Sequence, residues 1–176
     1  YLTNGNELNG KKVLVTAGPT YEKLDPVRFI GNHSSGKMGL AIAEELTRRG
    51  ADVLLILGPG NLEVPTNIQL IRVQSAEEMF NECIAVFPNM EIAVMSAAVA
   101  DYTPSKVADE KIKKTDGTLT LELKKTKDIL KHLGTIKKRN QFLVGFALET
   151  NNEVAYAQKK LKEKNANMIV LNSLND

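Results

Sequence analysis

The fold class is decided near the start of the chain, by the stretch Lys11-Lys12-Val13-Leu14-Val15-Thr16-Ala17-Gly18-Pro19. A short apolar run ended by turn-forming residues is typical of a strand that is buried on both faces. A second such run occupies residues 52–57. Between the two runs, apolar residues recur with the spacing of one helical face, at Met38, Ala41, Ile42 and Leu46. The region therefore predicts a strand–helix–strand unit, with Gly50 ending the helix.

The same alternation continues to the end of the chain. Further strands are predicted at 68–73, 92–99, 119–123, 142–147 and 168–171. The helices between them are one that Ser75 caps and Pro88 ends, one over 128–137, and one over 152–165 capped by Thr150 and Glu153. Such a rhythm implies right-handed crossovers. The predicted fold is α/β, a doubly wound, mainly parallel, Rossmann-like sheet with helices on both faces.

Length, charge and cysteine content limit the classes of protein to consider. The 176 residues, 43% of them hydrophobic, suit one domain at 11–176, with residues 1–10 as a linker from an upstream domain. A net charge of +2, from 23 basic and 21 acidic residues, argues against nucleic-acid binding. The single cysteine, Cys83, fits a reducing compartment, and no apolar run reaches the ~20 residues of a membrane span. We therefore expect a cytoplasmic protein without a membrane partner.

Residues directly after the predicted strands are the candidate site residues, because ligands of such a sheet bind beyond the carboxyl ends of its strands. Asp101 could accept a hydrogen bond from a ribose hydroxyl or a base amine. Phe146 could stack on a nucleobase, although core packing is the commoner role. The small side chains of Ser96, Ala97 and Ala98 would let a ligand approach the backbone, or would serve tight helix–sheet packing.

The loop Gly31-Asn32-His33-Ser34-Ser35-Gly36-Lys37-Met38-Gly39 leads into the first helix. It has the glycine and lysine spacing of a P-loop, but Met38 stands where the magnesium-binding hydroxyl belongs, and the loop starts long after the strand ends. An ordinary P-loop NTPase is therefore excluded. Ser34 and Ser35 could bind an anion at the helix start, or Ser35 could simply cap the helix. Asn32 could donate to a developing oxyanion, or could form a local turn.

Other cofactor motifs are absent or ambiguous. The first strand lacks the G-x-G-x-x-G fingerprint, and Pro19 lacks the N–H that a pyrophosphate would use, so a nicotinamide cofactor is not expected. Lys160 and Lys164 lie one helical turn apart and could clamp a polyphosphate, and Lys111 begins a Lys-Ile-Lys-Lys cluster. Both groups could instead be solvated surface. Neither Cys83 nor His132 is expected to be catalytic, and no His, Cys or Asp spacing indicates a zinc site.

Several segments in one order resemble the phosphopantothenoylcysteine synthetase family. They are Thr16-Ala17-Gly18-Pro19-Thr20, Leu24-Asp25-Pro26-Val27-Arg28, Asn32-His33-Ser34-Ser35-Gly36-Lys37-Met38-Gly39, Ala97-Ala98-Val99-Ala100-Asp101-Tyr102, Lys111-Ile112-Lys113-Lys114 and Gly145-Phe146-Ala147-Leu148-Glu149-Thr150-Asn151-Asn152. The resemblance covers residues 12–172 and is to the synthetase half of bacterial bifunctional coenzyme A biosynthesis proteins. In these a flavin-dependent decarboxylase half lies upstream, and FMN would belong to that half alone. Family members usually continue beyond this point, which implies a C-terminal truncation.

The resemblance implies a CTP-dependent ligase. The carboxylate of 4′-phosphopantothenate would attack the α-phosphorus of CTP, releasing pyrophosphate and leaving an acyl-cytidylate, and the amine of L-cysteine would then displace CMP. Such chemistry needs positioning and charge stabilisation more than a strong base, which suits lysines, backbone amides and an asparagine. Mg²⁺ would accompany the triphosphate, with ligands that the sequence leaves open. The preference for CTP over ATP rests on the resemblance alone.

The resemblance also implies roles for individual residues. Asn32, Arg28 and Lys111 would act in catalysis, with Lys111 serving the second half-reaction, and Asn32, Ala97 and Ala98 would contact the substrate. The CTP-binding set would comprise Ser96, Ala97, Asp101, Lys111, Lys127, Asp128, Ile129, Leu130, Phe146, Lys160 and Lys164. The protein would be a homodimer in which elements near Lys111 contribute across subunits, and part of a larger assembly where it is fused to the decarboxylase.

Two other functions are open at this point. A nicotinamide-dependent reductase could share this sheet, and hydride-transfer assays would identify it. A non-catalytic module could use its lysines to bind a partner or nucleic acid, and it would show no turnover with CTP and phosphopantothenate.

Overall fold

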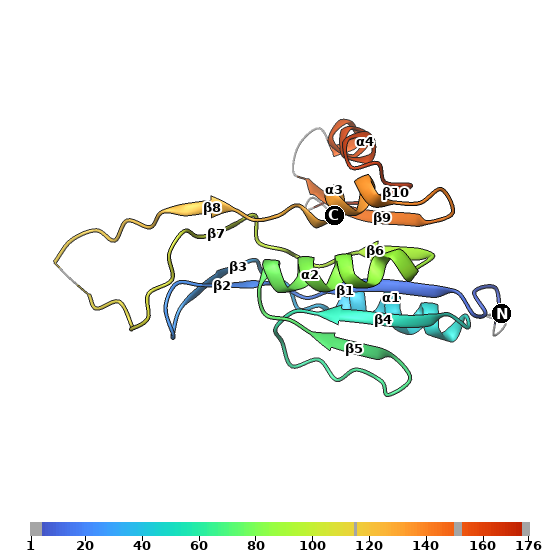
Figure 1. The fold of residues 1–176 in the computed structure, drawn as a ribbon, viewed down its shortest axis with the longest axis horizontal. Coiled ribbons are helices and arrows are strands. Elements are labelled where there is room, and N and C mark those ends of the chain that lie inside the picture. Colours follow the sequence, from blue (N-terminus) through green and yellow to red (C-terminus); the bar gives the residue numbers. More distant parts are fainter. Residues whose placement is uncertain (1–4, 115, 150–152, 174–176) are drawn as a thin grey trace.

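The computed structural model describes residues 5–114, 116–149 and 153–173, and its centre is a six-stranded sheet (Figure 1). The strands lie in the order β10-β9-β6-β1-β4-β5. Their bounds are β1 Lys12–Ala17, β4 Asp52–Leu57, β5 Gln69–Arg72, β6 Ile92–Met95, β9 Phe142–Glu149 and β10 Met168–Ser173. Every pairing within the sheet is parallel. The doubly wound, parallel α/β fold expected from the sequence is confirmed.

β1 lies in the middle of the sheet because nearly all of its side chains are apolar and can be buried on either face. Val13 pairs with Val53 of β4 on one side and with Ile92 of β6 on the other. Alternate residues enter two separate cores: Val13 and Val15 belong to one and Leu14 to the other, and all three are fully buried. A strand buried in this way has a continuous apolar sequence, which is the pattern that identified it.

Helices cover both faces of the sheet, as Figure 1 shows. In this view α1 (Lys37–Arg48) lies behind β1 and β4, whereas α2 (Ala76–Val86), continued by a 3-10 turn at Phe87–Asn89, lies in front. α3 (Ile129–Ile136) contributes to the same core as α2, and α4 (Glu153–Glu163) packs against β9 and β10. The helices therefore fill the connections between strands that the alternating pattern predicted.

Side chains cap two of these helices. Ser75 accepts a hydrogen bond from Glu78 N at the start of α2, which confirms the predicted cap. At the start of α3, the Asp128 carboxylate accepts a hydrogen bond from Lys131 N at 2.8 Å. The predicted cap at Thr150 falls outside the described residues, and α4 itself is confirmed from Glu153.

Two antiparallel hairpins project beyond the carboxyl ends of the strands, and we call them, with the described part of segment 105–122, the arm (Figure 1). β2 (Tyr21–Lys23) pairs with β3 (Phe29–Gly31). β7 (Tyr102–Pro104) pairs with β8 (Leu123–Lys125). The first hairpin occupies the interval between β1 and α1, which explains why the loop before α1 comes so long after the strand.

Two predicted strands differ from the structure. Residues 119–123 do not join the central sheet, because Leu119, Leu121 and Leu123 alternate with polar residues and are 54%, 38% and 41% exposed. Of these residues only Leu123 enters a strand, the antiparallel β8, whose residues are all exposed, unlike those of a buried parallel strand. The strand predicted over 92–99 ends at Met95. Beyond it, backbone N–H groups bond to the chain that follows β1, as when Ala98 N donates to the Gly18 carbonyl.

The order of the strands creates a crevice between β1 and β6. The chain leaves β1 toward its neighbour β4 and later returns to β6 on the opposite side of β1. The connections that leave the carboxyl ends of β1 and β6 therefore diverge. Open parallel sheets bind their ligands at such a point.

Candidate functional site

A cavity of about 640 Å³ opens beyond the carboxyl ends of β1, β6 and β9. Its volume is in the range of small-molecule sites. Its wall includes most of the residues that the family resemblance assigns to CTP, namely Ala97, Asp101, Lys127, Asp128, Ile129, Leu130, Phe146, Lys160 and Lys164. These residues come from segments far apart in the sequence, and the sheet brings them to one place.

Two lysines, Lys160 in α4 and Lys164 directly after its last residue, are held on the cavity wall by hydrogen bonds. Lys164 Nζ lies 2.5 Å from Asp128 Oδ2, and Lys160 Nζ donates to the Phe146 carbonyl at 2.8 Å. Burial would raise the pKa of Asp128, but the hydrogen bonds from Lys164 and from Lys131 N outweigh it, and the pKa is lowered. Asp128 is therefore ionised at neutral pH and orients the ammonium group of Lys164.

Residues 97 and 99–101 form another part of the wall, and threonine hydroxyls hold the backbone of this segment in place. Thr16 Oγ1 accepts a hydrogen bond from Ala97 N at 3.3 Å, and Thr20 Oγ1 accepts one from Ala100 N at 2.9 Å. Thr126 Oγ1 donates to the Ala100 carbonyl at 2.7 Å. Thr16 and Thr126 also line the cavity, although neither was predicted as a site residue. Thr16 could have been predicted, because it lies near the carboxyl end of a predicted strand.

Ser96 and Ala98 are not on the cavity wall. Ser96 Oγ donates to the Thr16 carbonyl at 2.6 Å, and Ala98 forms an isolated bridge to the chain after β1. A methyl group added to Gly39 would lie 2.5 Å from Ala17 Cβ and 2.7 Å from Ser96 Oγ. Small residues therefore let α1 approach β1 and β6 closely, and this geometry supports the packing alternative for Ser96 and Ala98.

Asn32 does not line the cavity, but it contacts a residue that does. Its Nδ2 donates to the carbonyl of Val99, a residue of the cavity wall, at 2.9 Å. The two residues are 67 positions apart, so the asparagine joins the loop before α1 to the loop after β6. The side-chain amide is thus oriented by a long-range contact, and Asn32 remains exposed to solvent. Such an amide can reach a bound acyl group, whereas the side chain of a local turn would be oriented by its own loop.

The serines before α1 make only local hydrogen bonds in the described structure. Ser34 Oγ accepts from Gly36 N at 3.3 Å, and Ser35 Oγ accepts from Lys37 N at 3.4 Å. The N-cap residue of α1 is Gly36, whose φ of 74° is in the left-handed region that favours glycine. The N-cap is therefore Gly36 and not Ser35, one residue later than the capping alternative predicted.

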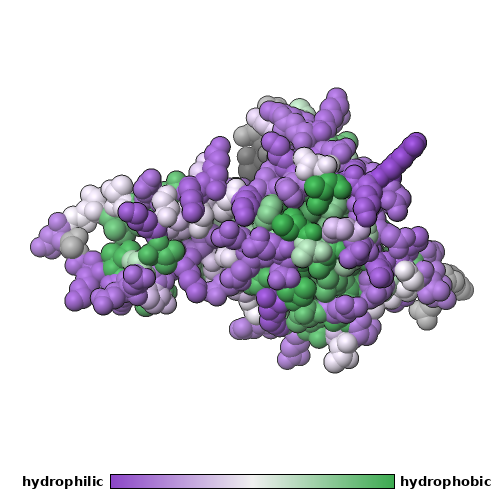
Figure 2. Space-filling model, in the orientation of Figure 1, coloured by the Kyte–Doolittle hydropathy of each residue, from purple (hydrophilic) through white to green (hydrophobic). Residues whose placement is uncertain are grey.

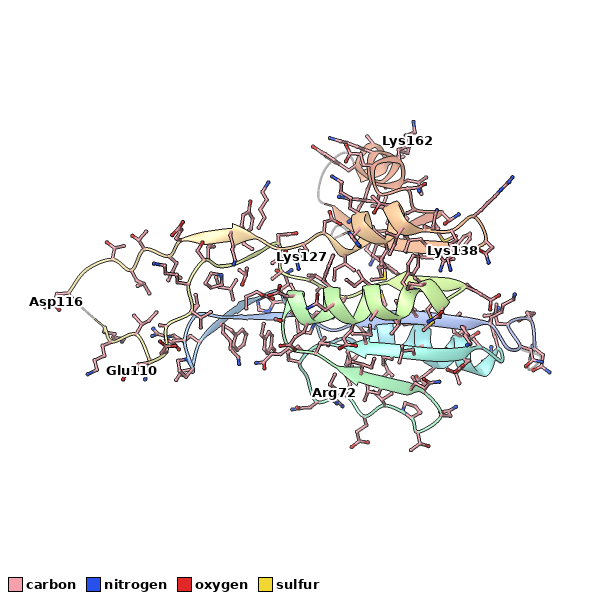
Figure 3. All side chains as sticks on the ribbon, viewed as in Figure 1. Arg72, Glu110, Asp116, Lys127, Lys138 and Lys162 are labelled. Atoms are coloured by element: carbon pink, nitrogen blue, oxygen red, sulfur yellow. The ribbon has the colours of Figure 1, made fainter. Side chains whose placement is uncertain are left out.

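Arg28 and Lys111 belong to the arm and not to the cavity wall. Arg28 Nε donates to the Asp25 carboxylate at 2.9 Å, and its Nη2 donates to the Ile112 carbonyl at 2.6 Å. Lys111 is exposed next to Ile112, and Figure 3 shows its other neighbour, Glu110, well out along the arm. The structure thus brings Arg28 close to the segment of Lys111, and leaves both outside the lining of the cavity.

Within the part of the chain that the structure describes, no cysteine or histidine lines the cavity. Cys83 is fully buried, and burial together with the charge of Glu82 raises the pKa of its thiol to about 12. His132 packs beside the Phe80 ring, at 5.0 Å between centroids. Within residues 5–114, 116–149 and 153–173, no group of three or more His, Cys, Asp or Glu side chains could hold a metal ion. The charged groups on the wall include the carboxylates of Asp101 and Asp128 and the ammonium groups of Lys160 and Lys164.

Comparisons with known proteins agree with this geometry. The family model of the DNA/pantothenate metabolism flavoprotein C-terminal domain matches residues 8–176. The coenzyme A biosynthesis bifunctional protein CoaBC of Bacillus subtilis (strain 168) is 52% identical over 168 residues, which are 95% of this chain and 41% of that protein. A cysteine/cysteine sulfinic acid decarboxylase of an unknown prokaryotic organism is 51% identical over 170 residues, 96% of this chain and 47% of that protein.

A solved structure extends the comparison to the fold. The crystal structure of the C-terminal domain of a coenzyme A biosynthesis bifunctional protein CoaBC matches with a TM-score of 0.86 and 49% identity, over 96% of this chain and 80% of that one. The chain spans less than half the length of the curated relatives described above. The resemblance first seen in the motifs is confirmed over nearly the whole chain, and the protein belongs to the family of the DNA/pantothenate metabolism flavoprotein C-terminal domain.

Proposed function

We propose that this domain is a ligase that joins 4′-phosphopantothenate to L-cysteine, with CTP as the activating nucleotide. The cavity beyond β1, β6 and β9 carries the proposal, because its wall combines the groups that a nucleotide requires. Lys160 and Lys164 offer positive charge to a triphosphate, Phe146 offers a ring to a base, and Asp101 offers a carboxylate to a ribose hydroxyl or a base amine. Relatives named coenzyme A biosynthesis bifunctional protein support the substrate assignment.

The reaction proceeds in two steps. A carboxylate oxygen of phosphopantothenate bonds to the α-phosphorus of CTP, and the bond from that phosphorus to the pyrophosphate oxygen breaks. The cysteine amine then bonds to the acyl carbon, loses a proton, and CMP leaves with the electrons of the acyl–oxygen bond. Asn32, which donates to the carbonyl of Val99 on the cavity wall, would contact the acyl group, as would Ala97 of the wall. Positioning and charge stabilisation supply most of the rate enhancement of such steps.

Magnesium fits this site as the companion of a triphosphate. Mg²⁺ prefers oxygen ligands, retains several waters, and commonly needs only one or two carboxylates besides phosphate oxygens. Asp101 and Asp128 both place carboxylates on the cavity wall. When bound, the ion would neutralise charge that develops on the phosphates.

We infer that two copies associate through the arm. Figure 2 shows apolar side chains gathered there, away from the main body. The exposed apolar residues of the arm are Val27, Phe29, Tyr102, Val107, Leu119, Leu121 and Leu123. Contiguous exposed apolar surface commonly marks an interface. A homodimer formed in this way would let Lys111 of one subunit serve the cavity of the other, and sedimentation equilibrium at several concentrations tests it.

The proposal extends to the longer protein that the relatives suggest. An upstream flavin-dependent decarboxylase domain would hold FMN, and it would account for the greater length of the curated relatives. No helix in the described part of the chain is long and apolar enough to cross a membrane. A cytoplasmic location is part of the proposal, and fractionation of cells that express the full gene tests it.

Mass spectrometry of a single mixture tests the function. The protein is incubated with CTP, Mg²⁺ and 4′-phosphopantothenate without cysteine, and we expect an acyl-cytidylate together with pyrophosphate. Addition of L-cysteine then yields phosphopantothenoylcysteine and CMP. A parallel reaction with ATP measures nucleotide preference, and one with cysteine sulfinic acid measures release of carbon dioxide. Absence of both the acyl-cytidylate and pyrophosphate with folded protein would overturn the proposal.

A further inference from the structure

We propose that Asp25 is a positioning residue that holds Arg28 and the backbone next to Lys111 as one unit. This inference rests on the proposed ligase function, in which Arg28 and Lys111 act on the acyl intermediate. Asp25 lies in the turn between β2 and β3, 87 residues before Ile112, and it touches both partners directly. Its role is to set the geometry of other groups and not to meet the substrate.

The Asp25 carboxylate is fully enclosed and fully bonded. Its side chain has no exposed surface. Oδ1 accepts hydrogen bonds from Val27 N and Arg28 N, both at 2.8 Å. Oδ2 accepts from Arg28 Nε at 2.9 Å, from Arg28 Nη2 at 2.5 Å and from Ile112 N at 3.1 Å. Because these donors occupy the acceptor positions of both oxygens, Asp25 cannot also act as a general base.

These bonds determine which part of Arg28 is available. Nε and Nη2 are engaged by Asp25, and Nη2 also donates to the Ile112 carbonyl. Nη1 is thus the guanidinium nitrogen that makes no hydrogen bond to the residues that the structure describes, and it can donate to a ligand. The side chain of Arg28 is 38% exposed, so an anion can reach it. A guanidinium fixed on one edge can present its other edge to a carboxylate or phosphate with little loss of rotamer freedom.

The same turn also fixes the segment that carries Lys111. Ala108 N donates to the Leu24 carbonyl at 2.9 Å. At the other end, Ile112 N donates to Asp25 and Ile112 O accepts from Arg28. Residues 108–112 are therefore attached at both ends, although they belong to a long segment that projects with the arm (Figure 1). Loss of the Asp25 charge would release Arg28 and Lys111 together.

The test uses Asp25→Asn, because it keeps the shape of the side chain and removes its charge and one acceptor group. Displacement of reacting groups by about 1 Å can cost roughly 100-fold in rate, so we expect kcat for amide formation to fall about 100-fold. The KM for CTP should stay within about twofold, because Asp25 does not line the cavity. The acyl-cytidylate should accumulate in rapid-quench samples that contain cysteine. Asp25→Glu, which keeps the charge, should recover part of the rate.

A double variant separates positioning from general loss of structure. If Asp25 acts through Lys111, the effects of the two substitutions should not add. The double variant Asp25→Asn with Lys111→Gln should then have a kcat within about threefold of that of Lys111→Gln alone. Glu22→Gln is the matched control: Glu22 is also a buried carboxylate at the base of the arm, and it accepts from Ala76 N at 2.8 Å. It should lower the melting temperature and leave kcat unchanged.

The outcomes distinguish the two proposals. A wild-type protein that forms no acyl-cytidylate refutes the ligase function, whatever the variants do. If the wild type is a ligase, an unchanged kcat in Asp25→Asn refutes the role of Asp25. The role is refuted equally if the kcat losses of the two single variants multiply in the double variant. Should Asp25→Asn not fold, Asp25→Glu must still show a lower kcat at an unchanged KM for CTP, and a normal kcat in that variant refutes the role equally.

Discussion

Lys164 Nζ, directly after the end of α4, lies 2.5 Å from Asp128 Oδ2 at the N-cap of α3, so that one ion pair joins the end of one helix to the start of another beside the cavity. Both residues line the cavity. The carboxylate is held in turn by Lys131 N, which makes the position of the ammonium group a consequence of how α3 begins. A lysine oriented in this way can meet a triphosphate without first losing the freedom of a surface side chain.

Replacement of Lys164 should weaken nucleotide binding more than it slows chemistry. For Lys164→Gln we expect the KM for CTP to rise at least tenfold, about 1.4 kcal/mol, with a smaller change in kcat. Steady-state rates of pyrophosphate release measure both parameters. Lys159→Gln is the control, because Lys159 lies in α4, which ends next to Lys164, and pairs with Glu163 at 3.8 Å, outside the cavity lining. Equal effects of the two substitutions would contradict the assigned role of Lys164.

The Asp128–Lys164 pair should stabilise the fold at neutral pH and lose this effect in acid. The pKa of Asp128 is lowered in the folded state, so its contribution is present above the unfolded pKa of about 3.9 and disappears as pH falls through the lowered value. Asp128→Asn should therefore melt below the wild type at pH 7, and the difference should shrink below pH ~4. Calorimetry at several pH values measures the difference in melting temperature. Glu77→Gln is the control, because Glu77 belongs to an exposed ion pair. A difference that is constant with pH would contradict the prediction.

Asn32→Asp should abolish product formation and preserve the fold. The substitution replaces the donor that meets the Val99 carbonyl with an acceptor, so the side chain turns away and brings negative charge toward an anionic intermediate. We expect a loss of at least 100-fold in phosphopantothenoylcysteine formation, as for removal of an oxyanion-stabilising donor. Circular dichroism checks the fold. The control is Asn61→Asp, at another exposed loop position, which should have normal activity. Full activity of Asn32→Asp would contradict a role for Asn32 in the reaction.

Gly39→Ala should destabilise the protein through crowding. The added methyl group would lie 2.5 Å from Ala17 Cβ and 2.7 Å from Ser96 Oγ, so α1 must move away from β1 and β6. Over-packing of this kind typically costs about 1–3 kcal/mol of unfolding free energy. Urea denaturation measures the loss. Glu44→Gln, on the exposed face of α1, should change stability by less than about 0.5 kcal/mol, and a neutral Gly39→Ala would show that this contact can relax.

The local pattern of apolar residues predicted most strands of the central sheet, because these strands are buried. β1, β4 and β9 are continuous apolar runs because both of their faces are covered, and such runs are visible without any knowledge of neighbours. The cap at Ser75 was also predictable, because its donor Glu78 N lies only three residues away. By contrast, the hairpin partners β7 and β8 are separated by the segment 105–122, and half-exposed strands carry a weaker signal.

The sequence by itself determined the order of the central-sheet strands and of the helices, the two-sided burial of β1, and which polar residues follow those strands, because these depend on side-chain period and turn chemistry within a few residues. Only the tertiary structure decided that Asn32 meets Val99, that Lys164 meets Asp128, and that Asp25 binds the backbone at Ile112. These contacts depend on strand register and on how long loops close. No short window of sequence encodes them, because many partners could satisfy the same donor or acceptor until the sheet has assembled.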